Sequence, residues 1–376
     1  PVATPPPAVL EALPREGFHG AHLVFVNGRL SPGLSSLEAG EPGVEVASLR
    51  DLLRSQPGRV EPWLSRAADG RTGVFADLNT AFAEDGAVVL VSPGAILKEP
   101  LRVAHVSAGA GAFSVAYART LVVAGRGSEC QVVETFASAD GRASLTNAVT
   151  EVVVEDNAFV DRYKLQLEGA ESLHVATLVA RLSRDARFSD HSLSFGAALS
   201  RNDIEVRFEA EGGECVLNGL FVADGRRVAD THSTVDHAKP HCSSRELYKG
   251  VLDGQARGVF NGLVMVRPGA QKTDAGQMNR NLLLSREALV HSTPQLEILA
   301  DDVKCKHGST TGQIDPTALF YLRSRGIGEA EARALLTWAF ASDLVRKMGV
   351  EPLRLAVARQ LQSRLAGGFD LAEAQP

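Results

Sequence analysis

The sequence predicts a mainly β protein with a parallel β-helix core, preceded by a small mixed α/β cap and followed by an α-helical domain. Three observations predict this fold class. Short β-rich runs separated by Gly, Asp, Asn and Ser fill the chain from Ala87 onward. Long amphipathic helices are absent before Asp315, which excludes a doubly wound α/β fold, because helices alternate with strands in that fold. The β-rich runs also repeat at a nearly fixed spacing.

The turns of this repeat begin at Arg126, Asp156, Arg184 and Gly212, so they recur every 28 to 30 residues. Aligned on the turns, apolar residues form three columns, which are Ala124, Val154, Leu182 and Ala210; Cys130, Val160, Phe188 and Val216; and Ala137, Leu167, Phe195 and Ala223. Period-2 alternation inside such a repeat gives each unit one buried face, which stacked coils can cover. A β-sandwich of irregular hairpins is the alternative, but it requires no fixed register between distant turns.

The cap is expected to comprise residues 1–83 and the β-helix residues 84–314. A strand and turn are predicted between Ala21 and Leu30, with Asn27 and Gly28 as the turn signal. Short helices are predicted at Leu49–Arg54 and Glu61–Ala68.

The C-terminal α-helical domain is expected to comprise residues 315–376. Asp315 and Pro316 suit the first two positions of a helix that ends near Arg325. Two further helices are predicted from about Glu329 to Met348 and from Pro352 to about Leu365. The second carries Leu336, Phe340, Leu344 and Val345 beyond a narrow apolar stripe, which predicts an exposed face that docks a protein. A self-contained helical packing that hides these residues is the alternative.

Composition excludes several classes of protein. The chain has 376 residues, of which 44% are hydrophobic and 22% charged, and a formal net charge of -6. This balance argues against a nucleic-acid binder and against binding to an anionic membrane. No apolar run approaches the roughly 18 residues of a transmembrane helix. The four cysteines form no CxxC pair, which indicates free thiols in a reducing cytoplasm.

The first candidate metal site is the pair Cys305 and His307. Residues two apart on a strand share a face, so the thiol and the imidazole point the same way. Such a pair suits iron or zinc, and the flanking Lys304 and Lys306 are expected to favour the thiolate. Two ligands do not complete a tetrahedral site, so the others are expected from another chain. The alternative is that Cys305 fills the core and His307 lies on the surface.

A second candidate metal cluster contains His232, His237 and His241, followed by Cys242. It could hold zinc or iron, but its spacings match no standard zinc pattern. The alternative is a loop-rich coil in which these side chains bond to the backbone. Nucleotide-binding motifs are missing: the segment from Pro268 to Thr273 lacks the spacing of a phosphate loop.

The stretch from His232 to Gly326 resembles the SufB/SufD family of iron–sulfur cluster assembly proteins. The matching segments occur in family order: Asp236–His237, Ser244–Gly250, Val259–Arg267, Pro268–Asp274, Gln277–Ser285, Pro294–Ile298, Asp301–Gly308 and Leu319–Ile327. Phe25–Arg29 and the residues after the Cys305-Lys306-His307-Gly308 motif resemble the SufD branch. A SufB-like chain is the close alternative, since SufB usually has Glu where this chain has Gly308.

The resemblance implies a right-handed β-helix and a scaffold subunit without catalysis of its own. It implies pairing with SufB through the β-helices and binding of the SufC ATPase through the C-terminal helices, with a possible homodimer when the chain is isolated. Cys305 and His307 match the family's assembly residues, so transient iron or an iron–sulfur cluster is expected at the SufB interface, with ligands shared between chains. No nucleotide is expected on this chain.

A β-helix enzyme acting on carbohydrates is the alternative from another class. Such enzymes need paired carboxylates or a calcium site with a basic residue. No carboxylates recur on one face of successive coils, and aromatics are only 6% of the chain. We therefore favour the scaffold.

Overall fold

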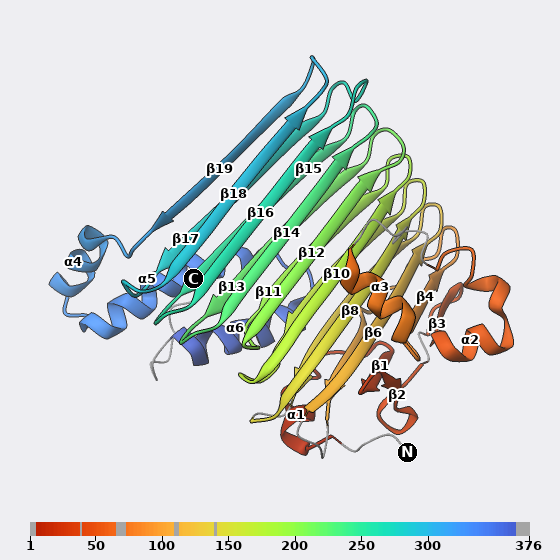
Figure 1. Cartoon of the computed structure of the whole chain (residues 1–376), viewed down its shortest axis with the longest axis horizontal. Coiled ribbons are helices and arrows are strands. Elements are labelled where there is room, and N and C mark those ends of the chain that lie inside the picture. The colour runs from red at the N-terminus through yellow and green to blue at the C-terminus, as the bar shows by residue number, and fades with distance from the viewer. Residues whose placement is uncertain (1–4, 38–39, 65–72, 109–112, 139–140, 366–376) are drawn as a thin grey trace.

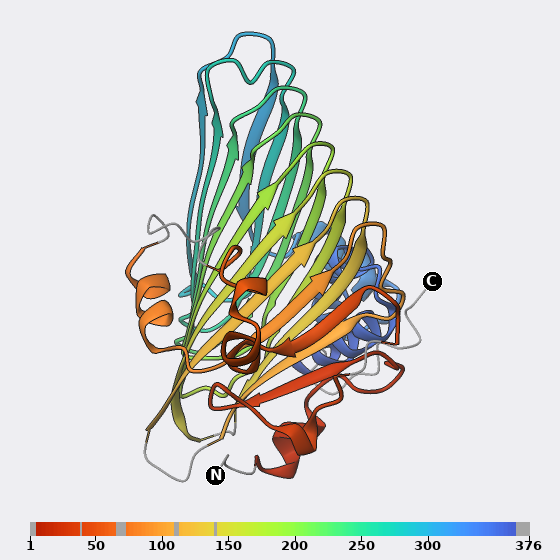
Figure 2. The ribbon, with the colours of Figure 1, turned by 90° about the vertical axis from the view of Figure 1, so that its right-hand side faces the viewer.

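The computed structural model describes residues 5–37, 40–64, 73–108, 113–138 and 141–365. Two parallel sheets run the length of the molecule, and successive strands alternate between them (Figure 1). Each coil therefore contributes one strand to each sheet, and the connecting turns stack in regular steps (Figure 2). This architecture confirms the predicted parallel β-helix.

We call the two sheets A and B. Sheet A contains β1 (His22–Val26), β2 (Arg29–Leu30), β5 (Leu101–Ser107), β7 (Glu129–Ser138), β9 (Phe159–Gln166), β11 (Arg187–Ser194), β13 (Glu214–Ala223), β15 (Ser243–Leu252), β17 (Asp274–Leu283) and β19 (Lys304–Gly312). Sheet B contains β3 (Val44–Ser48), β4 (Ala87–Val91), β6 (Phe113–Ala124), β8 (Ala143–Val154), β10 (Ser172–Leu182), β12 (Leu199–Phe208), β14 (Val228–His237), β16 (Arg257–Val266) and β18 (Leu289–Ile298). The helices are α1 (Pro7–Glu11), η1 (Pro32–Leu34), α2 (Leu49–Ser55), η2 (Pro57–Arg59), α3 (Val74–Phe82), α4 (Pro316–Ser324), α5 (Glu329–Val345) and α6 (Glu351–Leu365).

The predicted apolar columns are in register for two steps and slip at the third. Phe188 pairs with Cys215, not with Val216, and Leu182 pairs with Phe208, not with Ala210. At this third step, the paired residue comes one position earlier in the chain than the turn alignment predicts in sheet A, and two positions earlier in sheet B. Because one residue of slip reverses the face, Val216 lies on the outer surface of sheet A rather than in the core.

The third column slips in the same way. Ser194 pairs with Phe221, so Phe195 lies beside Val222 rather than Ala223. The regular turn spacing therefore locates the coils correctly but does not fix the strand register.

The N-terminal residues continue both sheets. β1 pairs in parallel with β5 and forms a hairpin with β2, whose turn places Asn27 and Gly28 at positive φ (50° and 76°) as the turn signal predicts. α2 begins where a helix is predicted, and the Ser48 side chain caps it by accepting from the Asp51 N–H. The helix predicted at Glu61–Ala68 is a turn over Glu61–Leu64 and otherwise lies outside the described residues. The boundaries of the three predicted domains remain predictions.

The inside of the solenoid has two different halves. One half is an apolar core that includes Val154, Leu182 and Phe208. The other half is lined by polar and charged side chains that are also fully buried. Arg162 lies at its centre, with its Nε 2.5 Å from Glu134 Oε2 and its Nη1 2.5 Å from Asp190 Oδ1.

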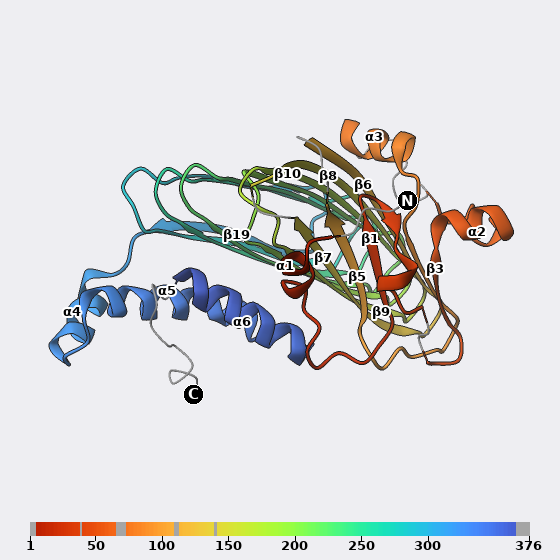
Figure 3. The same ribbon diagram turned by 90° about the horizontal axis from the view of Figure 1, so that it is seen from below.

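The C-terminal helices α5 and α6 lie along the outer face of sheet A, whereas α3 lies on the opposite side of the solenoid (Figure 3). This arrangement corrects the expected docking face. Leu344 and Val345 are buried against sheet A, and Leu336 and Phe340 are half-buried. None of the described helices is both long enough and apolar enough to span a bilayer.

Candidate functional site

The last coil is the open end of the solenoid. β18 and β19 are the outermost strands of sheets B and A, and Figure 1 shows them at the end opposite β1 and β3. Side chains of β18 alternate between exposed and half-buried, although the equivalent inward positions of β16 are buried. Each strand also has hydrogen-bonding groups along its outer edge that face no other strand in the described part of the chain.

Cys305 and His307 lie on this open edge, and both face the inside of the solenoid. Cys305 pairs with Ala275 and His307 with Gln277, and both partners are buried inward residues of β17. Cys305 is half-buried against the small apolar cluster around Ala275, whereas His307 is exposed. The shared face predicted for these two residues is therefore present.

The thiol of Cys305 is not activated by its lysine neighbours. Burial raises the pKa of this thiol, and a backbone hydrogen bond from Ala275 only partly opposes the effect. Lys304 and Lys306 alternate with Cys305 along the strand, so they lie on the outer face. The expectation that they favour the thiolate is wrong. A metal ion would itself have to displace the thiol proton, because the ligand form of cysteine is the thiolate.

His307 continues a column of polar inward residues. Its neighbour Gln277 donates from Nε2 to Glu246 Oε1 at 3.1 Å, and Glu246 Oε2 accepts from Ser233 Oγ at 2.7 Å. Glu246 makes no ion pair with any described basic residue. Burial raises the pKa of its carboxyl to about 7. Sequence reasoning missed Glu246, although its even spacing from Ser244 places both on one face.

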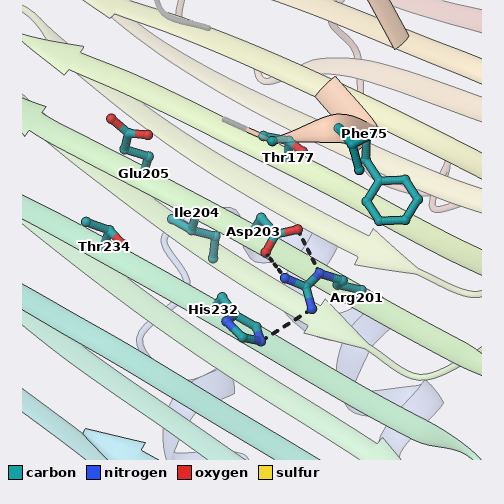
Figure 4. A pocket seen from close by; sticks show the side chains of 10 residues that line it. Phe75, Thr177, Arg201, Asp203, Ile204, Glu205, His232 and Thr234 are labelled. Atoms are coloured by element: carbon teal, nitrogen blue, oxygen red, sulfur yellow. Dashed lines mark hydrogen bonds and ion pairs between the residues drawn. The ribbon is translucent and has the colours of Figure 1, made fainter. Parts of the chain in front are cut away.

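The structure does not bring the second histidine cluster together. His232 lies on the outer face of sheet B, where it helps to line a pocket (Figure 4). Its Nε2 is 3.0 Å from Asp230 Oδ1. Figure 4 also shows His232 beside Arg201, which makes two hydrogen bonds to Asp203. These contacts form a surface ion-pair network.

His237 and His241 occupy different environments from His232. His237 points inward, where its Nε2 lies 2.9 Å from Ser244 Oγ, and burial lowers its pKa to about 4. His241 is an exposed turn residue at φ 60°, and the buried Cys242 thiol contacts backbone carbonyls. Within the described residues, no group of three or more His, Cys, Asp or Glu side chains has a metal-binding arrangement.

Comparison with known proteins identifies the family of this chain. Residues 105–340 match the model of the SufBD core domain of the SUF system for FeS cluster assembly, and residues 16–103 match the SufBD N-terminal region. The iron-sulfur cluster assembly protein SufD of Escherichia coli is 35% identical over 348 residues, which cover 92% of this chain and 79% of that protein. A SufBD family protein of Synechocystis is 32% identical over 89% of this chain and 76% of its own length.

A more distant relative has the same name. The iron-sulfur cluster assembly protein SufD of Bacillus subtilis is 25% identical over 77% of this chain and 66% of that protein. The family models and the similarity to E. coli SufD agree with the resemblance seen in the sequence and with the observed β-helix. The chain belongs to the SufBD family of iron–sulfur cluster assembly proteins, and it is SufD-like.

Proposed function

We propose that this chain is a non-catalytic scaffold subunit in which Cys305 and His307 supply ligands to iron or to a nascent cluster, shared with a SufB-like partner. One observation carries the proposal: a thiol and an imidazole face inward together on β19, the edge strand that pairs only with β17 among the described strands. Within the described residues, these two side chains have no third metal ligand grouped with them. The partner's edge supplies the missing ligands.

Pairing with the partner occurs through the open end. In a parallel ladder, alternate residues direct their N–H and C=O groups to opposite neighbours. Lys304 donates its N–H to Thr273 O at 2.8 Å, so the odd-numbered residues of β19 direct theirs to the free edge. A second β-helix edge can bond to that row and can cover Leu289 and Ile298, which are 48% and 40% exposed. In the isolated chain, a second copy is the other candidate for this edge.

The ATPase partner SufC binds at α4 rather than along α5. Within the described chain, α4 buries none of its residues, and its Phe320 and Tyr321 are 72% and 55% exposed. Exposed aromatics of this size are frequent anchors of protein interfaces. ATP hydrolysis belongs to that partner, and the cytoplasm is the compartment in which we place the complex.

The iron site is tested with the variants Cys305→Ser and His307→Ala in a co-expressed complex. Both should leave thermal unfolding and partner binding unchanged, because neither side chain is fully buried. Iron and sulfide bound per complex should fall several-fold in each variant and further in the double variant. His291→Ala is the matched control, because His291 is exposed at the same end but pairs with the outward Val259. Wild-type iron content in the double variant would refute the assignment.

The docking surface is tested with Phe320→Ser and Tyr321→Ser. Deletion of everything after Ile314 is a poor test, because it also uncovers the apolar surface of sheet A under α5 and α6. The double variant should lose SufC in a pull-down and keep its own stability. Leu355→Ser, at a 43% exposed position of α6, is the control that should retain SufC. Retention of SufC by the double variant at the control's level would contradict the α4 assignment.

A further inference from the structure

A second cleft lies on the outer face of sheet A, where strands β11 to β19 run beside α5. Its volume is about 730 Å³, and its lining includes His307 but not Cys305. Three outward columns of sheet A form its floor, and Asp343 and Lys347 of α5 form one wall. Clefts of this size accommodate small-molecule ligands.

The cleft carries an excess of positive charge. One of its cations is already paired: Arg245 Nη2 lies 2.7 Å from Asp274 Oδ2. Asp343 is itself paired with the buried Lys249, whose Nζ lies 2.7 Å from Asp343 Oδ1. The other three cations of the cleft are Arg280, Lys306 and Lys347, and all three are exposed. None of the three makes an ion pair with an acidic residue in the described parts of the chain.

The positive potential is visible in the titration of neighbouring groups. The hydrogen bond from Arg245 lowers the pKa of Asp274, and Lys304 and Lys306 add to the effect. Burial lowers the pKa of Lys249, Asp343 partly opposes this effect, and Arg280 and Lys347 add smaller lowering contributions. The nearby cations therefore disfavour the charged form of Lys249. An anion bound in the cleft would reduce the repulsion between these cations.

The floor of the cleft leaves room for a ligand. Gly276 lies between Arg245 and Lys306 in the outward column, and a Cβ at this position would be 3.5 Å from both side chains. The space above Gly276 is therefore open between two cations. The buried His191 and Asn218 add hydrogen-bonding groups deeper in the cleft, where burial lowers the pKa of His191 and keeps its ring neutral at neutral pH.

The spacing of the free cations sets the shape of the ligand. Lys306 pairs with Gly276, which is four residues before Arg280 on β17. At about 3.3 Å per residue and about 4.8 Å between strands, the backbone positions of Lys306 and Arg280 are roughly 14 Å apart. A chain of phosphates can span this distance and offer a separate phosphate group to each of the two side chains.

We propose that this cleft binds a small polyanion with two or more linked phosphate groups, held by Arg280, Lys306 and Lys347. Guanidinium and ammonium groups are the usual protein partners of phosphate oxygens. His307 of the proposed iron site also lines the cleft, so the test changes Arg280 and Lys347, which lie outside that site. Lys306 is left unchanged in the test because it lies next to Cys305.

The proposal is tested by isothermal titration calorimetry, in which tripolyphosphate is added to the purified full-length chain at low ionic strength. The wild type should bind one equivalent, and Arg280→Gln and Lys347→Gln should each weaken binding about tenfold, as expected for the loss of a charge-assisted hydrogen bond. Arg257→Gln removes the same charge from an exposed position of sheet B and should bind like the wild type. Inorganic phosphate should bind much more weakly than tripolyphosphate.

Titrations with ADP and adenosine distinguish the source of the phosphates. If ADP binds more tightly than pyrophosphate, and Arg280→Gln weakens both, the cleft binds phosphates carried on a nucleoside. If pyrophosphate binds at least as tightly as ADP, the phosphate chain alone is recognised. The proposal is overturned if the wild type does not bind tripolyphosphate, if the three variants bind it equally, or if adenosine binds as tightly as ADP.

Discussion

The two ends of the solenoid differ in how they are finished. At the N-terminal end, Leu23 and Phe25 of β1 are fully buried, β2 is only two residues long, and β3 pairs antiparallel with β4 beside α2. At the C-terminal end, β18 and β19 are long and leave large apolar side chains such as Leu289 exposed. A solenoid needs a cap at each end, and an unprotected edge strand invites pairing. The chain caps one end itself, and within the described residues the other end stays open.

The largest effect is expected from introducing an aspartate at either of two equivalent inward positions, one in an interior coil and one in the last coil. Val235 is fully buried on β14, and Leu296 occupies the equivalent inward position of β18, two coils later. Val235→Asp should cost about 4 kcal/mol or more and abolish soluble expression, because it buries an unpaired charge. Leu296→Asp should leave the isolated chain folded and prevent it from pairing with its partner.

Circular dichroism and co-purification of the partner measure these two outcomes. Equal loss of folding in both variants would show that the last coil is as closed as the interior coils, and the comparison of the two ends would fail.

Proline at neighbouring positions of β19 separates the paired edge from the free edge. By the alternation seen at Lys304, Thr310 directs its N–H to β17 and Thr311 directs its N–H outward. Thr310→Pro should destabilise the isolated chain by about 2 kcal/mol, since it removes a ladder hydrogen bond. Thr311→Pro should change the chain's stability by less than about 1 kcal/mol but weaken partner pairing. Urea unfolding and a pairing assay on both variants check the difference, and identical results would contradict the proposed free edge.

The smallest effect is expected from replacing Glu246, which should change how the free energy of unfolding depends on pH. Its folded pKa of about 7 lies above the ordinary value of 4.5, so the folded protein holds this proton more tightly than the unfolded chain does. The stabilising contribution is therefore complete in acid and is lost as the pH rises through about 7. Glu246→Gln should remove about 2 kcal/mol of this decline between about pH 5 and about pH 8.

Glu134 provides the contrast for this measurement. Burial alone would raise its pKa, but the charge of Arg162 and the nearby His105 lower it overall. Glu134→Gln should therefore destabilise the protein most above the ordinary carboxyl pKa, and less as the pH falls. Parallel slopes for the two variants in urea unfolding at several pH values would show that the two carboxyls do not differ in this way.

The coils could be predicted from the sequence because turn residues and period-2 alternation are local signals. The register could not be predicted throughout, because the coil between Phe188 and Cys215 is shorter than its turn spacing indicates. The buried face of α5 was assigned wrongly for a related reason. Its apolar residues are spread around the helix, and only the tertiary structure shows that Leu344 and Val345 contact sheet A.

The site was predictable to the extent that it depends on one strand. The shared face of Cys305 and His307 follows from their spacing of two. The same parity argument separates His232 from His237, which are five apart and face opposite sides of β14. The titration of Cys305 was not predictable, because its burial depends on Ala275, which comes from another coil. The cleft between sheet A and α5 was equally hidden, because α5 and β17 come together only in the fold.

The buried ion pairs of Arg162 inside the solenoid fix the register between neighbouring coils. Apolar columns alone tolerate a shift of two residues, because such a shift keeps the same face inward. A shift of two would move Arg162 of β9 away from Glu134 on one neighbouring coil and Asp190 on the other, and would leave charges buried without partners. The ion pairs of Arg162 therefore allow only one register between β9 and its two neighbouring strands. Because these three residues lie on three successive coils, a chimera with a relative must take all three coils from the same parent.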